Sequence, residues 1–368
     1  MALSEQTFFV ISKYHEDGLS IIDTIPTKNF EGGHMNYIAI DAHSSTCTMC
    51  VLDSKGCEKD SSQIETNGRL IKNYLRSFTG KKIVTFEESE LSSWLFDIIR
   101  PEAEEVLVCN PVAIKDYTKK KTDKLDSRKL ARLLRGGFLV PVYHDGSKRE
   151  KFRHLISGYN ALVEDAVRMK NRYKSIFRKS GNKQTGTKIY NDGSLLEDIS
   201  DAGHKFVGHH LYTLLVEMEK SREAYVREIK TQLKGFEEIK YIKSIPGLGD
   251  IQTAKIIANV VDPRRFANKH KFYSYCGLVR HQRISDGTKY GSNKIFGNRT
   301  LKCVYKMAGY SAINGNNVLN QYHAYLIKNG VNERNAYNAV CRKIAAISLA
   351  VWKNKKYFND EEILKLIK

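Results

Sequence analysis

The chain has 368 residues, and its 60 Lys and Arg against 41 Asp and Glu give a formal charge of +19 at pH 7. Since one hydrophobic core stops growing near about 250–300 residues, we expect two or three domains. With 41% hydrophobic and 27% charged residues, the composition is that of a folded protein and excludes wholesale disorder. We find no apolar run of about 18 residues for a transmembrane helix and no secretory signal.

The seven cysteines are scattered along the chain and odd in number. We therefore expect reduced thiols in a cytoplasmic protein rather than a disulfide scaffold. Cys47 and Cys50 have the spacing of a zinc or redox pair, but both lie in a strand-like run and no second Cys or His pair matches them.

The positive charge predicts a polyanionic partner. Nucleic acid is favoured over a membrane, because the basic residues form several blocks and the chain has only two Trp. Residues 241–306 contain 13 Lys and Arg against 3 Asp. A second basic block, Lys119-Lys120-Lys121, immediately precedes a helix that begins with acids. We expect these lysines to contact nucleic acid in a protein associated with the bacterial nucleoid.

Residues 1–34 form an N-terminal extension that has the pattern of a weak hairpin. Residues 35–146 alternate strands and helices after an opening hairpin, which predicts a mixed α/β sheet with flanking helices. The expected strands are 37–41, 46–52, 82–87 and 105–109, and the expected helices are 67–78, 90–99 and 122–135.

Residues 147–240 carry apolar side chains at helical spacing in two stretches separated by a polar segment, 180–201. This pattern predicts two long helices in an antiparallel hairpin or a dimerising coiled coil, with two ordinary core helices as the alternative. Residues 241–368 have a mainly helical pattern and form the expected C-terminal domain.

Four acids stand out in the α/β region. Asp41 and Glu87 each end a buried-type strand, and Asp123 and Asp126 share one face at the start of a helix. Four converging carboxylates stay ionised only beside a cation, and Mg²⁺ prefers such oxygen ligands. Two ions about 4 Å apart would clamp a phosphodiester displacement. The structural alternative is that each acid is an ordinary strand end or helix cap, with Asp123 as the cap.

The chain resembles the RuvC-like DEDD domain of the Piv-related insertion-sequence transposases in motifs that occur in the family's order. These are Ile40-Asp41, Phe86-Glu87, Asn110-Pro111, Lys121-Thr122-Asp123-Lys124-Leu125-Asp126 and Leu130-Ala131. The resemblance implies an RNase-H-like fold in which the four acids bind the catalytic metal ions. We choose Glu87 over Glu88, because Ser89 then falls where the family usually has Thr.

A second set of motifs begins at Ile245-Pro246-Gly247-Leu248-Gly249, which has the pattern of a helix-hairpin-helix turn. Gly247 and Gly249 would let a phosphate approach the next helix, and Arg264 and Arg265 follow. The alternative is a plain corner between two helices.

Further along, the chain resembles the C-terminal domain of the same transposases. The matching residues are Gly277-Leu278, Arg283-Ile284-Ser285-Asp286-Gly287, Gly291, Lys294 and Gly297-Asn298. The resemblance implies that Ser285 is the nucleophile of strand exchange, with Ser292 as the fallback. We place Arg283, Lys289 and Lys294 on the nucleic-acid surface.

The sequence therefore predicts a DNA transposase or recombinase. The resemblance also implies a structured non-coding RNA of the element as guide, and we expect a homo-dimer or homo-tetramer. One alternative is a Holliday-junction-type nuclease, or a site-specific DNA invertase without an RNA guide. Another is a non-catalytic nucleic-acid-binding protein. An actin-like sugar kinase shares Ile40-Asp41-x-x-Ser44, but its later Asp-x-Gly-x-Gly motif is missing.

Overall fold

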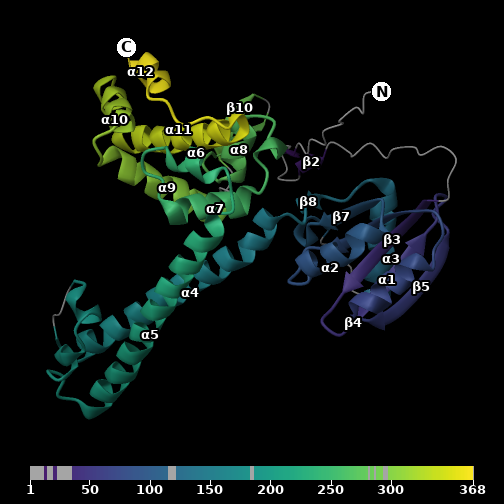
Figure 1. Ribbon diagram of the computed structural model, residues 1–368, viewed down its shortest axis with the longest axis horizontal. Helices are drawn as coiled ribbons and strands as arrows, with labels where there is room; N and C mark the ends of the chain where they lie inside the picture. Colours follow the sequence, from purple (N-terminus) through teal and green to yellow (C-terminus); the bar gives the residue numbers. More distant parts are fainter. Residues whose placement is uncertain are drawn as a thin grey trace. The chain divides into compact units, whose positions relative to one another are not determined.

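A computed structural model describes residues 12–14, 20–22, 35–114, 122–182, 186–280, 282–285, 287–292 and 297–367 (Figure 1). Contacts divide the chain into two compact units. The first contains Met1–Lys148 together with Arg283–Gly291, and the second contains Arg149–Gln282 together with Ser292–Lys368. Among the described residues, no helix combines the length and the apolar character needed to cross a bilayer.

The first unit is built on a six-stranded sheet with the strand order β5-β4-β3-β6-β7-β8. Strands β3, β6 and β7 are parallel, and β4, β5 and β8 each run antiparallel to the strand that they join. The strands are β3 (Met35–Ala42), β4 (Thr46–Leu52), β5 (Glu58–Glu65), β6 (Lys81–Glu87), β7 (Glu105–Cys109) and β8 (Pro141–Val142).

Helices cover both faces of this sheet. The helices of the first unit are α1 (Gly68–Arg76), α2 (Ser92–Ile99) and α3 (Asp123–Gly136), with the 3-10 turns η1 (Arg100–Glu102) and η2 (Pro111–Ile114). Ile38 and Ile40 of β3 pack with α1 and α2, whereas Ala39 packs with Leu130 and Leu134 of α3. Alternate residues of β3 thus face opposite helix layers, as the pleat of a strand requires.

This arrangement confirms the expected mixed α/β sheet and is compatible with the RNase-H-like fold. The expected helices and strands all occur, with ends shifted by one or two residues. Strand β5 was not expected, because its sequence Glu-Lys-Asp-Ser-Ser-Gln-Ile-Glu contains a single large apolar side chain. It forms because every residue from Thr46 to Leu52 offers it a pairing position at the sheet edge. Within the N-terminal extension, β1 (Ser12–Tyr14) pairs antiparallel with β2 (Ser20–Ile22).

The second unit begins with two long antiparallel helices, α4 (Lys148–Lys179) and α5 (Ala202–Leu233). Ring pairs run in opposite order along the two helices. Tyr173 lies near Tyr212, Tyr159 near Tyr225, and Phe152 near Phe236, which follows the end of α5. The connection is more than a polar loop. Its turns η3 (Lys188–Tyr190) and η4 (Gly193–Leu196) bury Ile189 and Leu196 in a small core at the tip of the hairpin.

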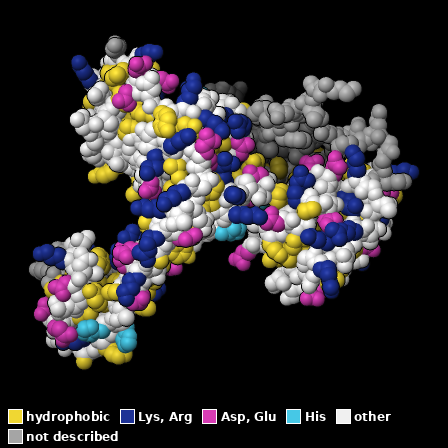
Figure 2. Space-filling view, in the orientation of Figure 1, with side chains coloured by type: hydrophobic (Ala, Val, Ile, Leu, Met, Phe, Trp, Pro, Cys, Tyr) yellow, Lys and Arg dark blue, Asp and Glu magenta, His cyan; other side chains and the backbone are white. Residues whose placement is uncertain are grey.

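The base of the hairpin shares a core with the C-terminal helices. These helices are α6 (Ile239–Lys243), α7 (Asp250–Val260), α8 (Lys269–Tyr275), α9 (Arg299–Ile313), α10 (Val318–Lys328), α11 (Glu333–Asn354) and α12 (Glu361–Ile367), with η5 (Pro263–Arg265) before α8. The mainly helical C-terminal region is therefore confirmed. Figure 2 shows Lys and Arg along α4 and α5 and over these helices, interspersed with Asp and Glu.

The tip of the hairpin contains a buried hydroxyl that tests this packing. Tyr173 is 0% exposed and its hydroxyl has no hydrogen-bond partner among the described residues. Tyr305 is equally buried, but its hydroxyl lies 2.9 Å from Ser348 Oγ. We predict that Tyr173→Phe keeps or raises the free energy of unfolding, while Tyr305→Phe lowers it by about 1 kcal/mol. Denaturant titration of both variants measures this, and an equal loss in the two would contradict the packing described.

Candidate active site

Asp41 lies on the sheet face that α3 covers. Ala39, two residues earlier on β3, packs against α3, so the pleat directs Asp41 to the same side. The last parallel pair of β3 and β6 is Ile40 with Phe86, which places Glu87 next to Asp41 in the register. Both acids therefore occupy the carboxyl ends of neighbouring parallel strands, at one edge of the sheet.

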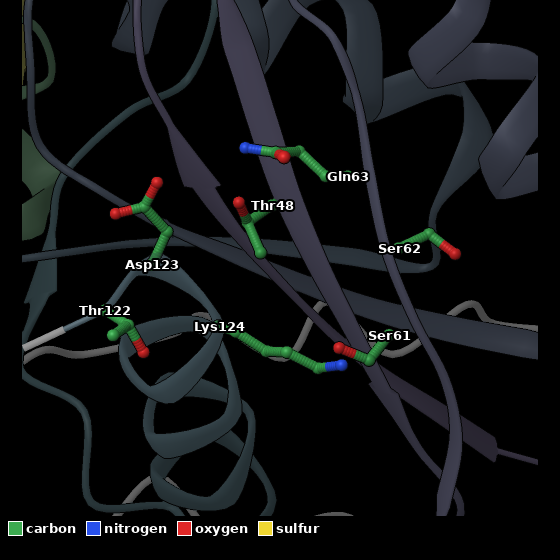
Figure 3. Close-up of a pocket in the computed structure, with 7 residues that line it drawn as sticks. All are labelled: Thr48, Ser61, Ser62, Gln63, Thr122, Asp123 and Lys124. Atoms are coloured by element: carbon green, nitrogen blue, oxygen red, sulfur yellow. The ribbon is translucent and has the colours of Figure 1, made fainter.

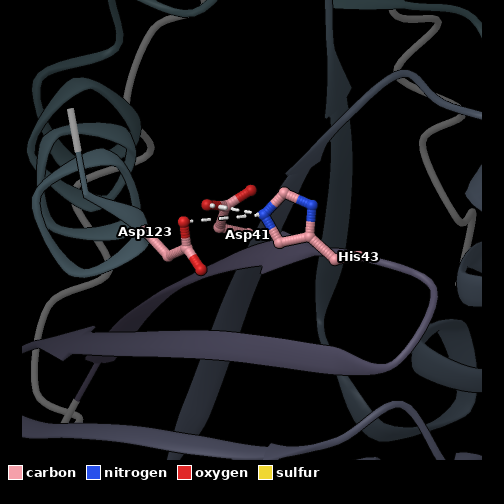
Figure 4. A group of neighbouring side chains, drawn as sticks. All are labelled: Asp41, His43 and Asp123. Carbon is pink, nitrogen blue, oxygen red and sulfur yellow. Dashed lines mark ion pairs between the residues drawn. The ribbon is translucent and has the colours of Figure 1, made fainter.

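Asp123 and Asp126 lie in the first turn of α3. The helix cap is Thr122, whose side chain accepts a hydrogen bond from the Leu125 N–H at 3.4 Å. Asp123 is therefore not the cap, and Figure 4 shows its carboxylate directed toward Asp41 instead. Carboxylates in this position also interact favourably with the positive end of the helix dipole.

A histidine completes the group. His43 follows β3, and its Nε2 lies 3.5 Å from Asp41 Oδ2 and 3.8 Å from Asp123 Oδ1 (Figure 4). One ligand atom from each of the three side chains lies within 4.8 Å of the others. The side chains of His43 and Asp123 are 54% and 52% exposed and that of Asp41 is 22% exposed, so the cluster is open to a large substrate.

The surroundings of Asp41 disfavour the ionised form of its carboxyl group. Burial raises the pKa of Asp41, and the charges of Asp123 and Asp126 raise that pKa further, while His43 lowers it in part. A divalent cation with oxygen ligands would relieve both the repulsion and the loss of hydration. The donor set therefore fits a divalent metal, which Asp41 and Asp123 would hold with Asp126 and Glu87 as further oxygen donors.

Glu87 and Glu88 face different layers. Glu88 Oε2 lies 2.6 Å from His144 Nε2, and the His144 ring packs against Phe96 of α2 at a centroid distance of 5.7 Å. Glu88 is thus held on the α2 side of the sheet. Since side chains alternate along β6, Glu87 belongs to the side of α3 and Asp41.

Comparison with known proteins places two stretches of the chain in related families. Residues 38–180 match the DEDD transposase family of IS110, and residues 239–324 match the transposase family IS116/IS110/IS902. The transposase for insertion sequence element IS1111A of Coxiella burnetii (strain RSA 493 / Nine Mile phase I) is 25% identical over 183 residues. That similarity covers 48% of this chain, which spans 50% of the relative's length.

These matches support an IS110-family insertion-sequence transposase. The first matched stretch contains all four acids, and its residues form α3, the whole of α4 and the sheet apart from the first residues of β3. The second contains the Gly247–Gly249 turn and Ser285. The two motif sets of the sequence therefore fall in the two matched families, in the same order.

The segment that carries the candidate serine is a β-hairpin. Strands β9 (Gln282–Ser285) and β10 (Thr288–Ser292) form a two-stranded sheet, and Ser285 is exposed at the end of β9. Arg283 and Lys289 are exposed on the same hairpin. Although this segment follows α8 in sequence, its contacts group Arg283–Gly291 with the unit that carries the acids.

The Gly247–Gly249 turn joins α6 to α7. Gly247 has a φ of +90°, and a Cβ there would lie 2.3 Å from the backbone oxygen of Ala308. Close packing against α9 therefore accounts for glycine at this position. Gly249 is the N-cap of α7, and Asp250 after it lies 2.5 Å from Lys243 Nζ.

The predicted basic contacts lie in different places. Arg264 is exposed in η5, while the Arg265 guanidinium packs over the rings of Phe266 and Tyr275 at 4.8 and 4.5 Å. The remaining predicted contacts, Lys119, Lys120, Lys121 and Lys294, lie outside the described residues, as does the side chain of Ser292.

Sequence reasoning missed His43 at this site. The sequence places His43 only two residues after Asp41, but a single histidine in a turn does not indicate a functional site unless its neighbours in space are known. It also missed Thr48 and Gln63, which share a row of the sheet with Asp41. Their row becomes visible only when the register of β3, β4 and β5 is known.

The raised pKa of Asp41 predicts a stability difference in metal-free protein. Because folding raises this pKa, the ionised carboxylate opposes folding at neutral pH, and that effect vanishes below the ordinary value of 3.8. In EDTA we expect Asp41→Asn to unfold at a higher temperature than wild type at neutral pH, with the difference lost as the pH falls toward 3.8. Thermal unfolding with the exposed-acid variant Glu90→Gln as control tests this. A less stable Asp41→Asn at neutral pH would contradict the electrostatic description.

Proposed function

We propose that this chain is the DNA transposase of an insertion sequence, which cleaves and rejoins DNA strands with Mg²⁺. The main support for this proposal is that the carboxylates of Asp41 and Asp123 lie close together at the carboxyl ends of the parallel strands. The charge of Asp126 also acts on Asp41. The two family matches and the similarity to the Coxiella transposase support the reaction class.

Asp41, Glu87, Asp123 and Asp126 would hold two Mg²⁺ ions, which when bound stabilise the negative charge that develops on phosphate oxygens during displacement. His43 has a different role. An imidazole nitrogen is a softer donor than Mg²⁺ prefers, and His43 Nε2 already faces Asp41 and Asp123. We assign it to orienting these two carboxylates.

Ser285 is the proposed nucleophile. Its Oγ forms a bond to phosphorus while one P–O bond to a deoxyribose oxygen breaks. The serine proton leaves to solvent or to a neighbouring base, and the leaving oxygen takes up a proton. The resulting phosphoserine keeps the energy of the phosphodiester for rejoining. Exposure of Ser285 at the end of β9 supports this assignment.

Basic residues outside the acid cluster would hold the DNA. We assign this role to Lys119, Lys120, Lys121, Arg264, Arg265, Arg283, Lys289 and Lys294, with the backbone at Gly247 and Gly249.

We further propose a structured non-coding RNA of the element as the guide, a role compatible with the formal charge of +19. Sequencing of RNA that copurifies with the protein tests this, and purified protein that recombines element ends without RNA would exclude it.

We also propose a homo-dimer or homo-tetramer. The distal half of the helical hairpin exposes Val167, Phe206, Val207 and Leu214, and a second copy of the chain would cover such apolar side chains. Light scattering of wild type beside Phe206→Ser measures the assembly, and a monomeric wild type would exclude it.

The acid assignment predicts the loss of strand cleavage. On duplex DNA that carries an element end, we expect Asp41→Asn, Asp123→Asn and Glu87→Gln each to lower the cleavage rate by about 10³-fold or more, because each removes a carboxylate that would hold the ions whose positive charge stabilises the transition state. Glu88→Gln and Glu90→Gln are matched controls, since Glu88 pairs with His144 and Glu90 is exposed. Cleavage at the wild-type rate by the Asp41 and Asp123 variants would contradict the acid assignment and favour a non-catalytic nucleic-acid-binding protein.

The serine assignment separates a covalent mechanism from a hydrolytic one. We expect Ser285→Ala to abolish the covalent protein–DNA adduct and strand exchange, which denaturing gels of labelled DNA detect. Because Ser285 is exposed, its loss should leave folding unchanged. Recombination by Ser285→Ala at the wild-type rate would instead favour a junction-type nuclease.

A further inference from the structure

The acidic edge continues as a polar row across the sheet. Asp41 pairs with Thr48 in the register of β3 and β4, and Thr48 pairs with Gln63 in the register of β4 and β5. Directly paired residues of neighbouring strands point to the same face, so Asp41, Thr48 and Gln63 line one side of the sheet. At about 4.8 Å per strand, the row extends about 10 Å beyond Asp41.

A groove lies over this row. Its volume is about 470 Å³, and one side is the first turn of α3 (Figure 3). The lining residues are Thr48, Ser61, Ser62, Gln63, Thr122, Asp123 and Lys124. Since Asp123 belongs both to this groove and to the carboxylate cluster, the two sites are continuous.

Thr48 distinguishes this groove from an ordinary surface depression. Its side chain is 5% exposed, and its hydroxyl has no hydrogen-bond partner among the described residues. Thr85, buried on the same sheet, instead donates its hydroxyl to the Leu107 carbonyl at 2.7 Å. A buried hydroxyl without a partner costs stability, so the Thr48 hydroxyl, which points between Gln63 and Asp123 in Figure 3, is poised for an acceptor.

The groove also offers a cation and an amide. Lys124 follows Asp123 on α3, and Figure 3 shows its side chain extending along the groove toward Ser61. Gln63 is exposed at the opposite wall, where its Nε2 lies 3.3 Å from Thr46 Oγ1. A hydroxyl donor, an amide and an ammonium in one line are the groups that bind phosphate and sugar oxygens of a nucleic-acid backbone.

We propose that this groove binds the sugar–phosphate of the nucleotide next to the scissile phosphate. Thr48 donates its hydroxyl to a phosphate oxygen, Lys124 supplies the countercharge, and the strand then continues to the carboxylates. The groove thereby sets which phosphate reaches Asp41 and Asp123. This inference rests on the proposed function, since it takes the strand in the groove to be the one that is cleaved.

The test uses the full-length protein and the element-end duplex that wild type cleaves. Thr48→Val keeps the shape of the side chain and removes the unpaired hydroxyl, so we expect the unfolding temperature to stay equal or to rise. We expect its affinity for this duplex to fall about tenfold, the effect of losing one charge-assisted hydrogen bond. Lys124→Met should weaken binding in the same way and with a smaller salt dependence.

The controls match these changes in chemistry on the other face of the sheet. Ser77→Ala removes a hydroxyl that donates to the Tyr74 carbonyl at the end of α1, and Lys72→Met removes a charge from the same helix, which packs on the opposite layer. A methylphosphonate beside the cleaved bond provides the second readout. It should weaken wild-type binding and add little to Thr48→Val, because both changes remove the same contact.

The outcomes separate the two proposals. Unchanged affinity of Thr48→Val, or full additivity with the methylphosphonate, overturns the groove assignment while cleavage by wild type persists. If cleavage also persists in Asp41→Asn and Asp123→Asn, the proposed function fails as well.

Discussion

The placement of three carboxylates, those of Asp41, Asp123 and Asp126, at one partly buried sheet face is the constraint on which the candidate site depends. Burial and the two neighbouring charges impose a cost on the ionised Asp41, which water reduces because the Asp123 side chain is 52% exposed. The packing of α3 on the sheet has to exceed this. Leu130 and Leu134 are buried against Ala39 of β3, and each such side chain contributes about 1.5–3 kcal/mol. The acids are thus held together by an apolar contact one to two turns further along the same helix.

This arrangement links stability to chemistry. A cation would stabilise a cluster that is unfavourable without one, and the open side of the cluster would admit a phosphodiester. Thr48 in the neighbouring row is similar, since its buried hydroxyl has no partner among the described residues and is unfavourable until it binds an acceptor. Both features destabilise the free protein slightly, and both lie on the α3 face of one sheet. A polyanionic strand that crosses this face would satisfy them together.

Much of this was predictable from sequence. The strand ending in Asp41, the strand ending in Glu87 and the helix beginning at Asp123 are marked by apolar runs and by helix caps, which are local signals. The choice of Glu87 over Glu88 rested on motif alignment, and the pairing of Glu88 with His144 gives it a physical reason. His43, Thr48 and strand β5 were not predictable. Their roles depend on the pairing register of the strands and on Thr122, which caps α3 and so leaves Asp123 free to face Asp41. These features bring together residues that share no local sequence pattern.

The proposed chemistry requires that Asp41 and Asp123 hold a divalent cation. Anomalous diffraction from crystals of the protein grown with Mn²⁺, which shares the oxygen-ligand preference of Mg²⁺, measures this binding. We expect an anomalous peak in contact with both carboxylates in wild type and its loss in Asp123→Asn. Wild-type crystals with no peak at these carboxylates, or with Mn²⁺ bound only to other acids, would contradict it.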